Sequence, residues 1–550
     1  MARGSTLTQP LAQPLALVAG IIALAVVMPV IGVAGLALRP GPDVWGHLLA
    51  YVVPQALRDT VLLLAGVSMV ALLIGGGTAW LVTGHEFPMR AWMVWLLPLP
   101  LAVPTYLAAY VYVDLFEPLG WIHRALISLM PAPDALHLLP DVRSLPGGIV
   151  LIGLVLYPYV FLAVRPVLQM RAADVGEAAL TLGARPGTIF RRVTLPLMRP
   201  ALMVGLALVA LETLNDIGAS EYLGIRTLTV SIYTLWLNQG SIAGAAQLAL
   251  VMLAMVGVLV ALEWRSRRAA AGADSETPRL ATRTRLSGWR GALACVACAL
   301  PVLFGFVVPV ICLAGETVRR GLAVIDTELL RAALHSVALA GGATVCALLA
   351  AFLVAIAVRW QPSRATILAA TVARSGYAVP GLVLALGLLT PVLMFENGLI
   401  ALARWLGLGN PGLILTSSGA IIVLAYTIRF LAVPVRYFGA ALQNVPKDYD
   451  DGARAAGASR WSMLRRIHLP LMTPAVIGAA IVVFVDGLKE LPATLLLRPL
   501  NVETLATHIY QYATRGNFEE GAPAALLIVA ASIVPVFWLS RLGEAPRGPA

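Results

Sequence analysis

Four carboxylates lie near the ends of two apolar segments, in two pairs with the same spacing. Glu212 and Asp216 are four residues apart, and so are Asp486 and Glu490. A spacing of four places both members of a pair on one face of a helix. Carboxylates in apolar segments are costly and often functional, and a hard trivalent cation prefers oxygen ligands. The pattern fits either a carboxylate-lined path for a cation or structural acids paired with Lys489 and nearby polar groups.

The composition indicates what surrounds these segments. The chain has 550 residues, of which 59% are hydrophobic and 12% charged, whereas soluble domains carry roughly 25% charged residues. A helix over 15–38 would be about 36 Å long, against a hydrocarbon core of about 30 Å. A signal peptide would have a shorter apolar region and a cleavage site, so we interpret this segment as a retained first span.

Apolar runs of about 17–25 residues predict an all-α polytopic membrane protein with about twelve transmembrane helices. The predicted spans are 15–38, 61–83, 91–113, 148–168, 199–215, 245–262, 292–315, 335–358, 366–394, 412–432, 474–490 and 522–540.

The distribution of charge predicts the orientation. With the N-terminus inside, Lys and Arg outnumber Asp and Glu in the inner segments, and the opposite holds outside. Positive residues favour the cytoplasmic side, so we expect both termini in the cytoplasm of a bacterial cell, with the chain in the inner membrane. The net charge of +11 then reflects the orientation in the membrane. Nucleic-acid binding would need a soluble basic face, and the sequence indicates none.

The two halves resemble each other. Val103-Pro104 recurs as Val379-Pro380, Gly183-Ala184 as Gly457-Ala458, and Ile232-Tyr233 as Ile509-Tyr510, at offsets of 276, 274 and 277 residues. Two tandem six-helix repeats follow, and an even number of spans makes both copies insert the same way. The predicted domains are an N-terminal segment with the first span (1–55), a first transmembrane domain (56–263), a cytoplasmic linker (264–291), the seventh span with an outer loop (292–330), a second transmembrane domain (331–541) and a C-terminal tail (542–550).

A loop with matched glycine and Leu-Pro positions occurs once in each half. Gly183 suits a helix C-terminal cap and Pro186 the first turn of a following helix, while Ser459 can act as an N-cap in the second copy. The loops therefore predict helix, break, helix. Their key positions are Glu177, Ala178, Ala179, Gly183, Leu195 and Pro196 in the first copy, and Asp451, Ala453, Gly457, Leu469 and Pro470 in the second.

This spacing resembles the "EAA" loop of type 1 ABC importer permeases. In that family the short helix around the glycine docks into a cleft of the ATPase subunit, so the resemblance implies two docking sites and two copies of an ATP-binding subunit. The first copy fits fully. The second has Asp451 in place of Glu and Gly452 in place of Ala, which leaves its docking strength open. Interfacial contact with lipid headgroups is the alternative for such basic loops.

The chain carries no sign of an ATPase or other catalytic site. A phosphate-binding G-x-x-x-x-G-K-[ST] loop is missing from the sequence. We expect a transport subunit without enzymatic activity or cofactor, with ATP used by the partner. The four cysteines lie in apolar runs, so we predict neither a disulfide framework nor a firm metal site.

Two longer stretches extend the resemblance to one subfamily. ETLNDIGASEYLG from Glu212 and LKELPATLLLRPLNVETLATHIY from Leu488 are similar to fused ferric-iron permeases. That resemblance implies translocation of iron(III) by alternating access, powered by an ABC ATP-binding subunit and supplied by a periplasmic or lipid-anchored iron-binding protein. The carboxylates as iron contacts remain an inference from their chemistry.

Other functions stay open at this point. A permease for thiamine, polyamines or another small solute would share the doubled layout. A secondary transporter driven by an ion gradient would lack the paired loops and the ATPase. A membrane scaffold or receptor subunit would need neither transport nor matched loops.

Overall fold

A computed structural model describes residues 12–39, 45–117, 141–181, 183, 185–270, 283–321 and 326–542. Within these ranges β structure is limited to one parallel pair, β1 (His85–Glu86) and β2 (Thr284–Arg285). The rest is helix and short connections, which confirms the predicted all-α fold. Side chains of 171–182, which include those of Glu177, Ala178 and Ala179, lie outside the described part.

Ten helical segments of the described ranges are long and apolar enough to span a membrane, or up to twelve if each of two bent pairs is one span. This confirms a polytopic membrane protein. The ten are Pro14–Ala37, Leu48–Gly84, Leu145–Gln169, Met198–Asn215, Ile242–Ser266, Trp289–Arg320, Thr327–Trp360, Gly381–Trp405, Arg460–Leu488 and Phe518–Phe537. The bent pairs are Arg90–Ala102 with Thr105–Phe116, at 89°, and Ala420–Phe430 with Ala432–Gln443, at 45°.

Three expected spans differ from the helices of the structure. The span predicted over 91–113 is broken into Arg90–Ala102 and Thr105–Phe116, and the one predicted over 412–432 begins only at Ala420 and continues, with a bend, to Gln443. The sequence predicts a single helix over 366–394, but α17 (Arg364–Ala373) ends early and α18 (Gly381–Trp405) carries the apolar run instead. The short 3₁₀ turn Gly376–Ala378 and Val379-Pro380 separate them. Proline lacks the amide hydrogen that a continuous helix needs, and it disfavours the helical conformation in the residue before it. Val103-Pro104 forms the corresponding break at the start of α6 (Thr105–Phe116).

The chain folds into two compact units. Unit 1 comprises Met1–Arg39 and Leu330–Thr504, and unit 2 comprises Pro40–Leu329 and Leu505–Ala550. The first predicted span therefore packs with helices of the second repeat, and the seventh span with helices of the first. The units are defined by packing and the predicted domains by sequence order, so the predicted domain boundaries remain predictions.

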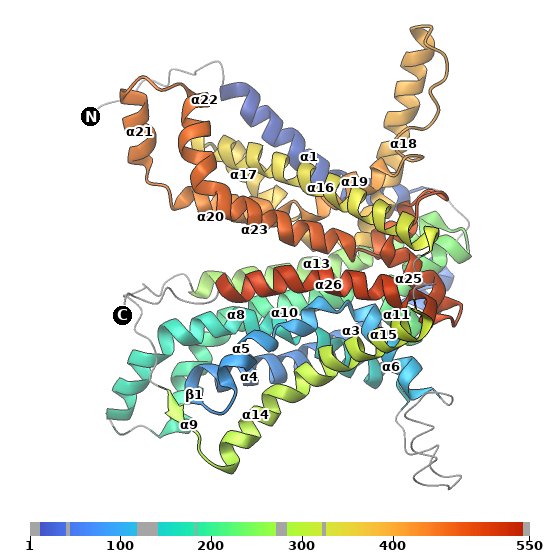
Figure 1. The fold of residues 1–550 in the computed structure, drawn as a ribbon. Coiled ribbons are helices and arrows are strands. Elements are labelled where there is room, and N and C mark those ends of the chain that lie inside the picture. Colours follow the sequence, from blue (N-terminus) through green and yellow to red (C-terminus); the bar gives the residue numbers. More distant parts are fainter. Residues whose placement is uncertain are drawn as a thin grey trace. The chain divides into compact units, whose positions relative to one another are not determined.

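The helices of unit 1 are α1 (Ala12–Ala37), α16 (Thr327–Trp360, which enters from unit 2), α17, α18, α19 (Ala420–Phe430), α20 (Ala432–Gln443), α21 (Lys447–Ala455), α22 (Arg460–Met463), η10 (Leu464–His468), α23 (Leu469–Leu488) and α24 (Pro492–Leu497). In Figure 1, α1 runs beside α17, and it packs against both α17 and α18. At the crossing of α1 and α18, a Cβ atom on Gly32 would overlap the carbonyl group of Gly387, and one on Gly387 would overlap that of Pro29. Two glycines thus let the backbones touch, as small residues do between membrane helices.

The helices of unit 2 are α2 (Trp45–His47), η1 (Leu48–Val52), α3 (Val53–Ala71), η2 (Leu72–Gly76), α4 (Gly77–Gly84), α5 (Arg90–Leu96), η3 (Leu99–Ala102), α6, α8 (Leu145–Thr181), α9 (Pro186–Ile189), η5 (Phe190–Thr194), α10 (Leu195–Asn215), α11 (Gly218–Tyr222), α12 (Leu228–Tyr233), η6 (Thr234–Asn238), α13 (Ile242–Ala270), α14 (Trp289–Val302), η7 (Leu303–Val307), α15 (Val308–Arg320), α25 (Leu505–Thr514) and α26 (Phe518–Leu542). The α8 helix packs against α3 and α10, and α26 packs against α15 and α25. Pairing of β1 with β2 joins the end of α4 to the segment before α14. The linker's final residues are thereby attached to the first repeat.

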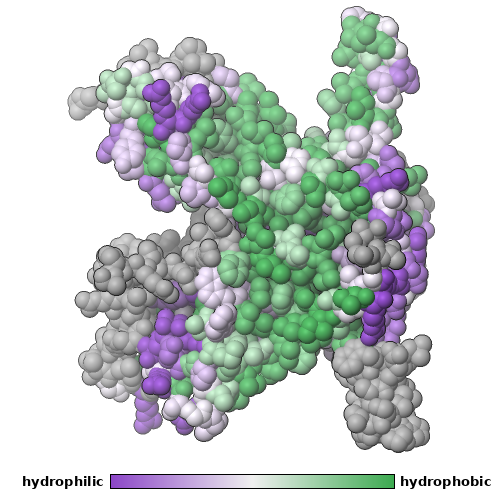
Figure 2. Space-filling view, in the orientation of Figure 1, coloured by the Kyte–Doolittle hydropathy of each residue, from purple (hydrophilic) through white to green (hydrophobic). Residues whose placement is uncertain are grey.

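Apolar side chains remain on the outer faces of the helices. On α1, Leu17, Ile21, Leu24 and Ile31 are each more than half exposed. In the face drawn in Figure 2, hydrophobic residues cover most of the middle of the helices, and hydrophilic residues gather toward their ends. Exposed apolar patches of this extent are rare on soluble monomers, and they suit a lipid environment.

The repeat predicted from sequence is visible in the elements themselves. Each half carries a glycine in the left-handed conformation, a four-residue helix, a five-residue π-helix and then a Leu-Pro that opens a long helix. In the first half these are Gly183, α9, η5 and α10, and in the second Gly457, α22, η10 and α23. Matching irregularities at matching positions support duplication more strongly than matching helices do, because regular helices are common to all such proteins.

Candidate docking loops and substrate path

The second loop forms the helix, break, helix arrangement that its sequence predicts. After α21, Gly457 has φ of +75°, its amide donates to the carbonyl of Arg454, and the amide of Ala458 donates to the carbonyl of Ala453. These two bonds define a Schellman cap, which satisfies carbonyls left over at the end of α21. Ser459 then caps α22 by accepting from the amide of Ser462 at 3.2 Å.

The first loop follows the same plan. The α8 helix carries the backbone of Glu177, Ala178 and Ala179 and ends at Thr181, while Gly183 has φ of +80°. Pro186 opens α9, where its missing amide hydrogen has no cost. Leu195 and Pro196 occupy the first two positions of α10, as Leu469 and Pro470 do in α23. The conformations of both loops match the predicted motif, and their role in docking remains a prediction.

Substitution of Gly457 should separate backbone conformation from side-chain bulk. A Cβ atom there would have no neighbour within 4 Å, so only the left-handed backbone resists replacement. Asn tolerates this conformation, whereas β-branched residues do not. Placing a β-branched residue in the left-handed conformation costs roughly 1–2 kcal/mol. We expect Gly457→Val to weaken co-purification of the ATPase subunit and Gly457→Asn to preserve it. Equal loss in both variants would show that bulk, not conformation, matters.

A buried ion network anchors the second loop. Asp450 of α21 accepts from Nε of Arg359 at 2.9 Å and from Nε2 of His468 at 2.9 Å. Arg359 also donates to the carbonyls of Leu442 and Val445, at 2.7 and 2.9 Å. The side chains of Arg359, Asp450 and His468 are 9%, 8% and 0% exposed. The network joins the end of α16, the end of α20 and η10 to α21.

The electrostatics favour the charged form of Asp450. Burial raises the pKa of its carboxyl, but hydrogen bonds and the charges of Arg359 and His468 lower it more, so the net shift is downward. Sequence reasoning singled out the neighbouring Asp451, whose carboxylate is 67% exposed and pairs with Arg454 at 2.6 Å. It missed Asp450 because the partner Arg359 is 91 residues away in the chain. In the first half, the positions that correspond to Asp450 and His468 at the repeat offset of 274 are occupied by Gly176 and Thr194.

The solvent-exposed face of the second loop is suited to contact with a protein. Tyr449 and Trp461 are 54% and 68% exposed, and Gly452 and Gly457 between them are exposed as well. Aromatic side chains dominate the energetics of many protein interfaces, and small residues allow a partner's backbone to come close. This combination of exposed aromatics and small residues fits a short helix that inserts into a cleft.

The two carboxylates of the second half have cationic partners. Asp486 pairs with Lys489 at 2.9 Å, and Glu490 with Arg429 at 3.4 Å. Glu490 is also buried, and it accepts from the amide of Ala493 at 3.0 Å, at the start of α24. This is the geometry expected of structural acids.

The first half differs at the corresponding position. Asp216 is buried and accepts from the amide of Ala219 at 2.9 Å, which matches the bond of Glu490 at an offset of 274. It forms no ion pair with any described residue, and its Oδ2 is buried without a hydrogen-bond partner among them. Glu212 is half-buried on the same helix, α10. The structure therefore brings each predicted pair to the end of one helix. Both acids of the second pair have cationic partners, whereas Asp216 of the first pair has none among the described residues.

Two further buried oxygens without partners occur near Asp216. The hydroxyl groups of Tyr110 on α6 and Ser220 on α11 make no hydrogen bond with the described residues, and α6 packs against α11. The ring of Tyr110 stands edge-on to that of Tyr222, with centroids 4.5 Å apart. Buried polar atoms are normally hydrogen-bonded, so unpaired oxygens from three residues make this part of unit 2 a candidate path for a ligand.

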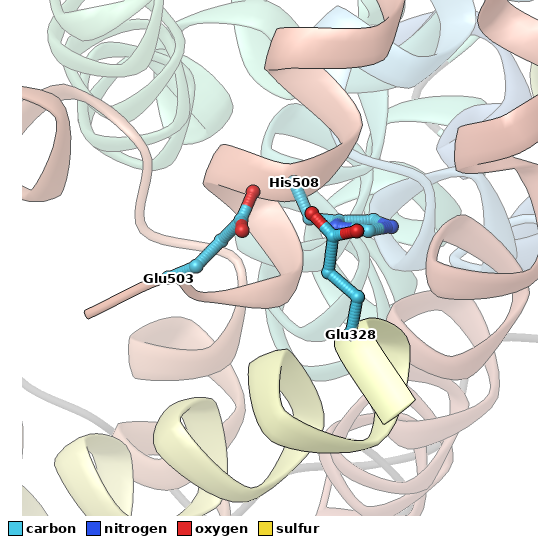
Figure 3. Close-up of side chains that lie close together, drawn as sticks. All are labelled: Glu328, Glu503 and His508. Carbon is cyan, nitrogen blue, oxygen red and sulfur yellow. The ribbon is translucent and has the colours of Figure 1, made fainter. Parts of the chain in front are cut away.

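Figure 3 draws a different group of side chains, Glu328 on α16, Glu503 before α25 and His508 within α25. Glu328 and His508 belong to unit 2 and Glu503 to unit 1. Because the three residues come from both units, we assign no metal site to them.

Comparison with known proteins places these features in a family. The model of the binding-protein-dependent transport system inner membrane component matches the chain twice, over residues 71–268 and 344–545. The "Fe(3+)-transport system permease protein FbpB 2" of Haemophilus influenzae is 25% identical over 495 residues, covering 88% of this chain and 90% of that protein.

Shorter relatives are named as permeases for other cargoes. The sulfate transport system permease protein CysW of Escherichia coli is 32% identical over 38% of this chain and 73% of its own length. The molybdenum transport system permease protein ModB of Escherichia coli is 31% identical over 38% of this chain and 93% of its own length. Each of these matches a little over a third of the chain, whereas the iron permease matches nearly all of it. With the family's unit present in both halves, this chain belongs to the binding-protein-dependent transport system inner membrane components, as a fused two-domain ABC transporter permease.

Proposed function

We propose that this chain forms the membrane pathway of an ATP-driven importer for iron(III). The choice of iron(III) as the cargo rests on one observation. The chain is similar along nearly its whole length to a protein named as an Fe(3+)-transport permease. The physical support is a set of buried oxygen atoms in unit 2, because hard trivalent cations prefer oxygen ligands.

The two loops support coupling to ATP. Each presents a short helix with a glycine break beside the end of a long helix, so movement of a docked ATPase subunit would be transmitted to the spans. Closure of two ATPase subunits on ATP would move both loops together, open the path to the outside, and reset it after hydrolysis. The permease itself would make no chemical change in its cargo.

The partners and orientation belong to the same proposal. Two copies of an ABC ATP-binding subunit would dock on the loops, and a periplasmic or lipid-anchored iron-binding protein would deliver the cargo on the opposite side. The chain would lie in the bacterial inner membrane with both termini in the cytoplasm, the orientation that the Lys and Arg distribution favours.

An oxyanion such as sulfate or molybdate is the second candidate cargo, favoured by the half-length relatives. Charge distinguishes the two. A path for an oxyanion needs donors and cations, which the second half supplies as Arg429 and Lys489, but both of these already have acidic partners. Asp216 adds a buried carboxylate without an identified cation, which would repel an oxyanion and attract a metal ion.

Removing the charge of Asp216 should therefore reduce iron uptake. Asp216→Asn keeps the side-chain volume and an oxygen that can accept from Ala219, so α11 stays capped. We expect a fall of roughly tenfold, equivalent to about 1.4 kcal/mol, in uptake of radioactive iron(III) by proteoliposomes that hold the assembled complex. Thiamine, sulfate and molybdate serve as competitors, and none of them should reduce uptake.

The matched control is Asp326→Asn. Asp326 caps α16 by accepting from the amide of Leu329 at 2.7 Å, and it is exposed, so its variant should transport normally. In the same assay, Asp486→Asn combined with Glu490→Gln should reduce uptake while assembly survives if these acids line the path, whereas loss of assembly would make them structural. Unchanged uptake in Asp216→Asn, or competition by an oxyanion, would overturn iron as the cargo.

A further inference from the structure

Unit 1 contains a cavity of about 330 Å³ beside the second docking loop. It lies between the end of α16, the α17 helix, the end of α20 and the start of α21. Its walls are partly apolar, with Val354, Val435 and Leu442 among them, and three cationic side chains line it as well, those of Arg359, Arg374 and Lys447. The volume is at the lower end of the range of small-molecule sites, roughly 300–1,000 Å³.

Two of the three cations are available to a ligand. Arg359 is occupied by Asp450 and by backbone carbonyls of the α20–α21 connection. Arg374 and Lys447 are exposed, and their side chains make no ion pair or hydrogen bond with the described residues. The guanidinium of Arg374 lies over Gly439, where an added Cβ atom would be 3.2 Å from its Nη2. A glycine in α20 thus leaves room for Arg374 at the cavity.

The cavity combines the two properties that a phospholipid would require. Its cations match a phosphate group, and its apolar walls match the glycerol and acyl carbons next to that group. Basic pockets between transmembrane helices on the cytoplasmic side are known to bind anionic headgroups. We propose that an anionic phospholipid binds in this cavity, with its phosphate between Arg374 and Lys447.

The bound lipid would brace the second docking loop. Lys447 is the first residue of α21, and Asp450, three residues later, is held by Arg359 of the same cavity wall. A phosphate between Lys447 and Arg374 would connect α21 to α17, in addition to the existing link from α21 to α16. In the first half, Ala173 corresponds to Lys447 at the repeat offset of 274, and Pro98 corresponds to Arg374 at the offset of 276. The site therefore belongs to the second half alone, and it is independent of which cargo is transported.

Native mass spectrometry of the full-length purified chain tests the proposal. Phosphatidylglycerol and inorganic phosphate are titrated separately, so that a lipid headgroup and a free phosphate can be told apart. Arg374→Gln combined with Lys447→Gln should weaken phosphatidylglycerol binding at least tenfold. The matched control is Arg364→Gln with Arg404→Gln, which removes two exposed charges of the same unit outside the cavity and should bind lipid normally.

A second variant fills the cavity and retains its charges. A Cβ atom at position 439 would meet only the flexible end of Arg374, and the rest of a leucine side chain would extend into the cavity. We therefore expect Gly439→Leu to fold with an unchanged thermal midpoint and still lose lipid binding. Normal lipid binding in both cavity variants would overturn the proposal, as would saturable binding of inorganic phosphate without lipid. Cross-links from position 374 or 447 to the assembled ATPase, with loss of bound lipid, would instead assign the cavity to the protein partner.

Discussion

Asp450→Asn should detach the second docking loop from its unit and abolish stable assembly with the ATPase subunit. The variant leaves Arg359 buried at 9% exposure without its counter-charge. Removing one partner of a buried ion pair costs about 3–5 kcal/mol, and α21 has only nine residues. We expect hydrogen exchange in the α21 peptide to accelerate strongly, together with loss of ATPase co-purification.

The adjacent residue provides the control. Asp451→Asn removes an equal charge one position along, but Asp451 and Arg454 are 67% and 65% exposed. Such exposed pairs contribute about 0–1 kcal/mol, so exchange in α21 should stay nearly unchanged. Any effect of Asp451→Asn on assembly with the ATPase subunit would then come from a lost docking contact and not from a destabilised loop. If the two variants behave alike, the buried network does not anchor the loop.

Gly32→Leu should displace α1 from α18 and destabilise unit 1. A side chain at this position would overlap the backbone of Gly387, and backbone atoms cannot move aside as a side-chain tip can. Overpacking of a tight contact costs roughly 1–3 kcal/mol, occasionally more. A lower midpoint of thermal unfolding for the purified chain in nanodiscs, with reduced abundance in the membrane, is the expected result.

Gly35→Leu is the matched control on the same helix. A Cβ atom on Gly35 would have no neighbour within 4 Å, so the leucine can point toward lipid at little cost. The thermal midpoint of this variant should equal that of the parent chain. A similar loss in both variants would mean that the helix itself, rather than its crossing with α18, is sensitive to substitution.

Local features of this protein are readable from the sequence because neighbouring residues determine them. Gly183 and Gly457 end helices because glycine accepts a positive φ without a Cβ penalty, and the structure has both there. Pro186 and Ser459 begin the helices that follow, for reasons confined to a single turn. The apolar runs likewise identify the spans, since the membrane thickness fixes their length. Two predicted spans, 366–394 and 91–113, are interrupted at Val379-Pro380 and Val103-Pro104, and the helix predicted over 412–432 begins only at Ala420. The apolar composition of these segments does not show where such breaks fall.

Contacts between distant residues required the tertiary structure. Arg429 and Glu490 are 61 residues apart in the chain, and Arg359 and Asp450 are 91 apart. The sequence predicts either a cation path or structural acids paired with Lys489, and it names no partner for Glu490. The structure pairs Asp486 with Lys489 and Glu490 with Arg429, and it shows no cationic partner for Asp216 among the described residues. Neutralisation of a charge depends on which helices meet, and helix pairing is not encoded in local spacing.

The amino-acid sequence by itself determined a helical membrane protein, doubled, with two loops of defined spacing. Only the tertiary structure decided that α1 packs with the second repeat and α14 with the first, and that Asp450 rather than Asp451 anchors the second loop. The physical reason is common to both. Apolar spans are nearly interchangeable in their affinity for lipid, so their neighbours are selected by close contacts such as Gly32 with Gly387 and by buried ion pairs, which form only when distant segments come together.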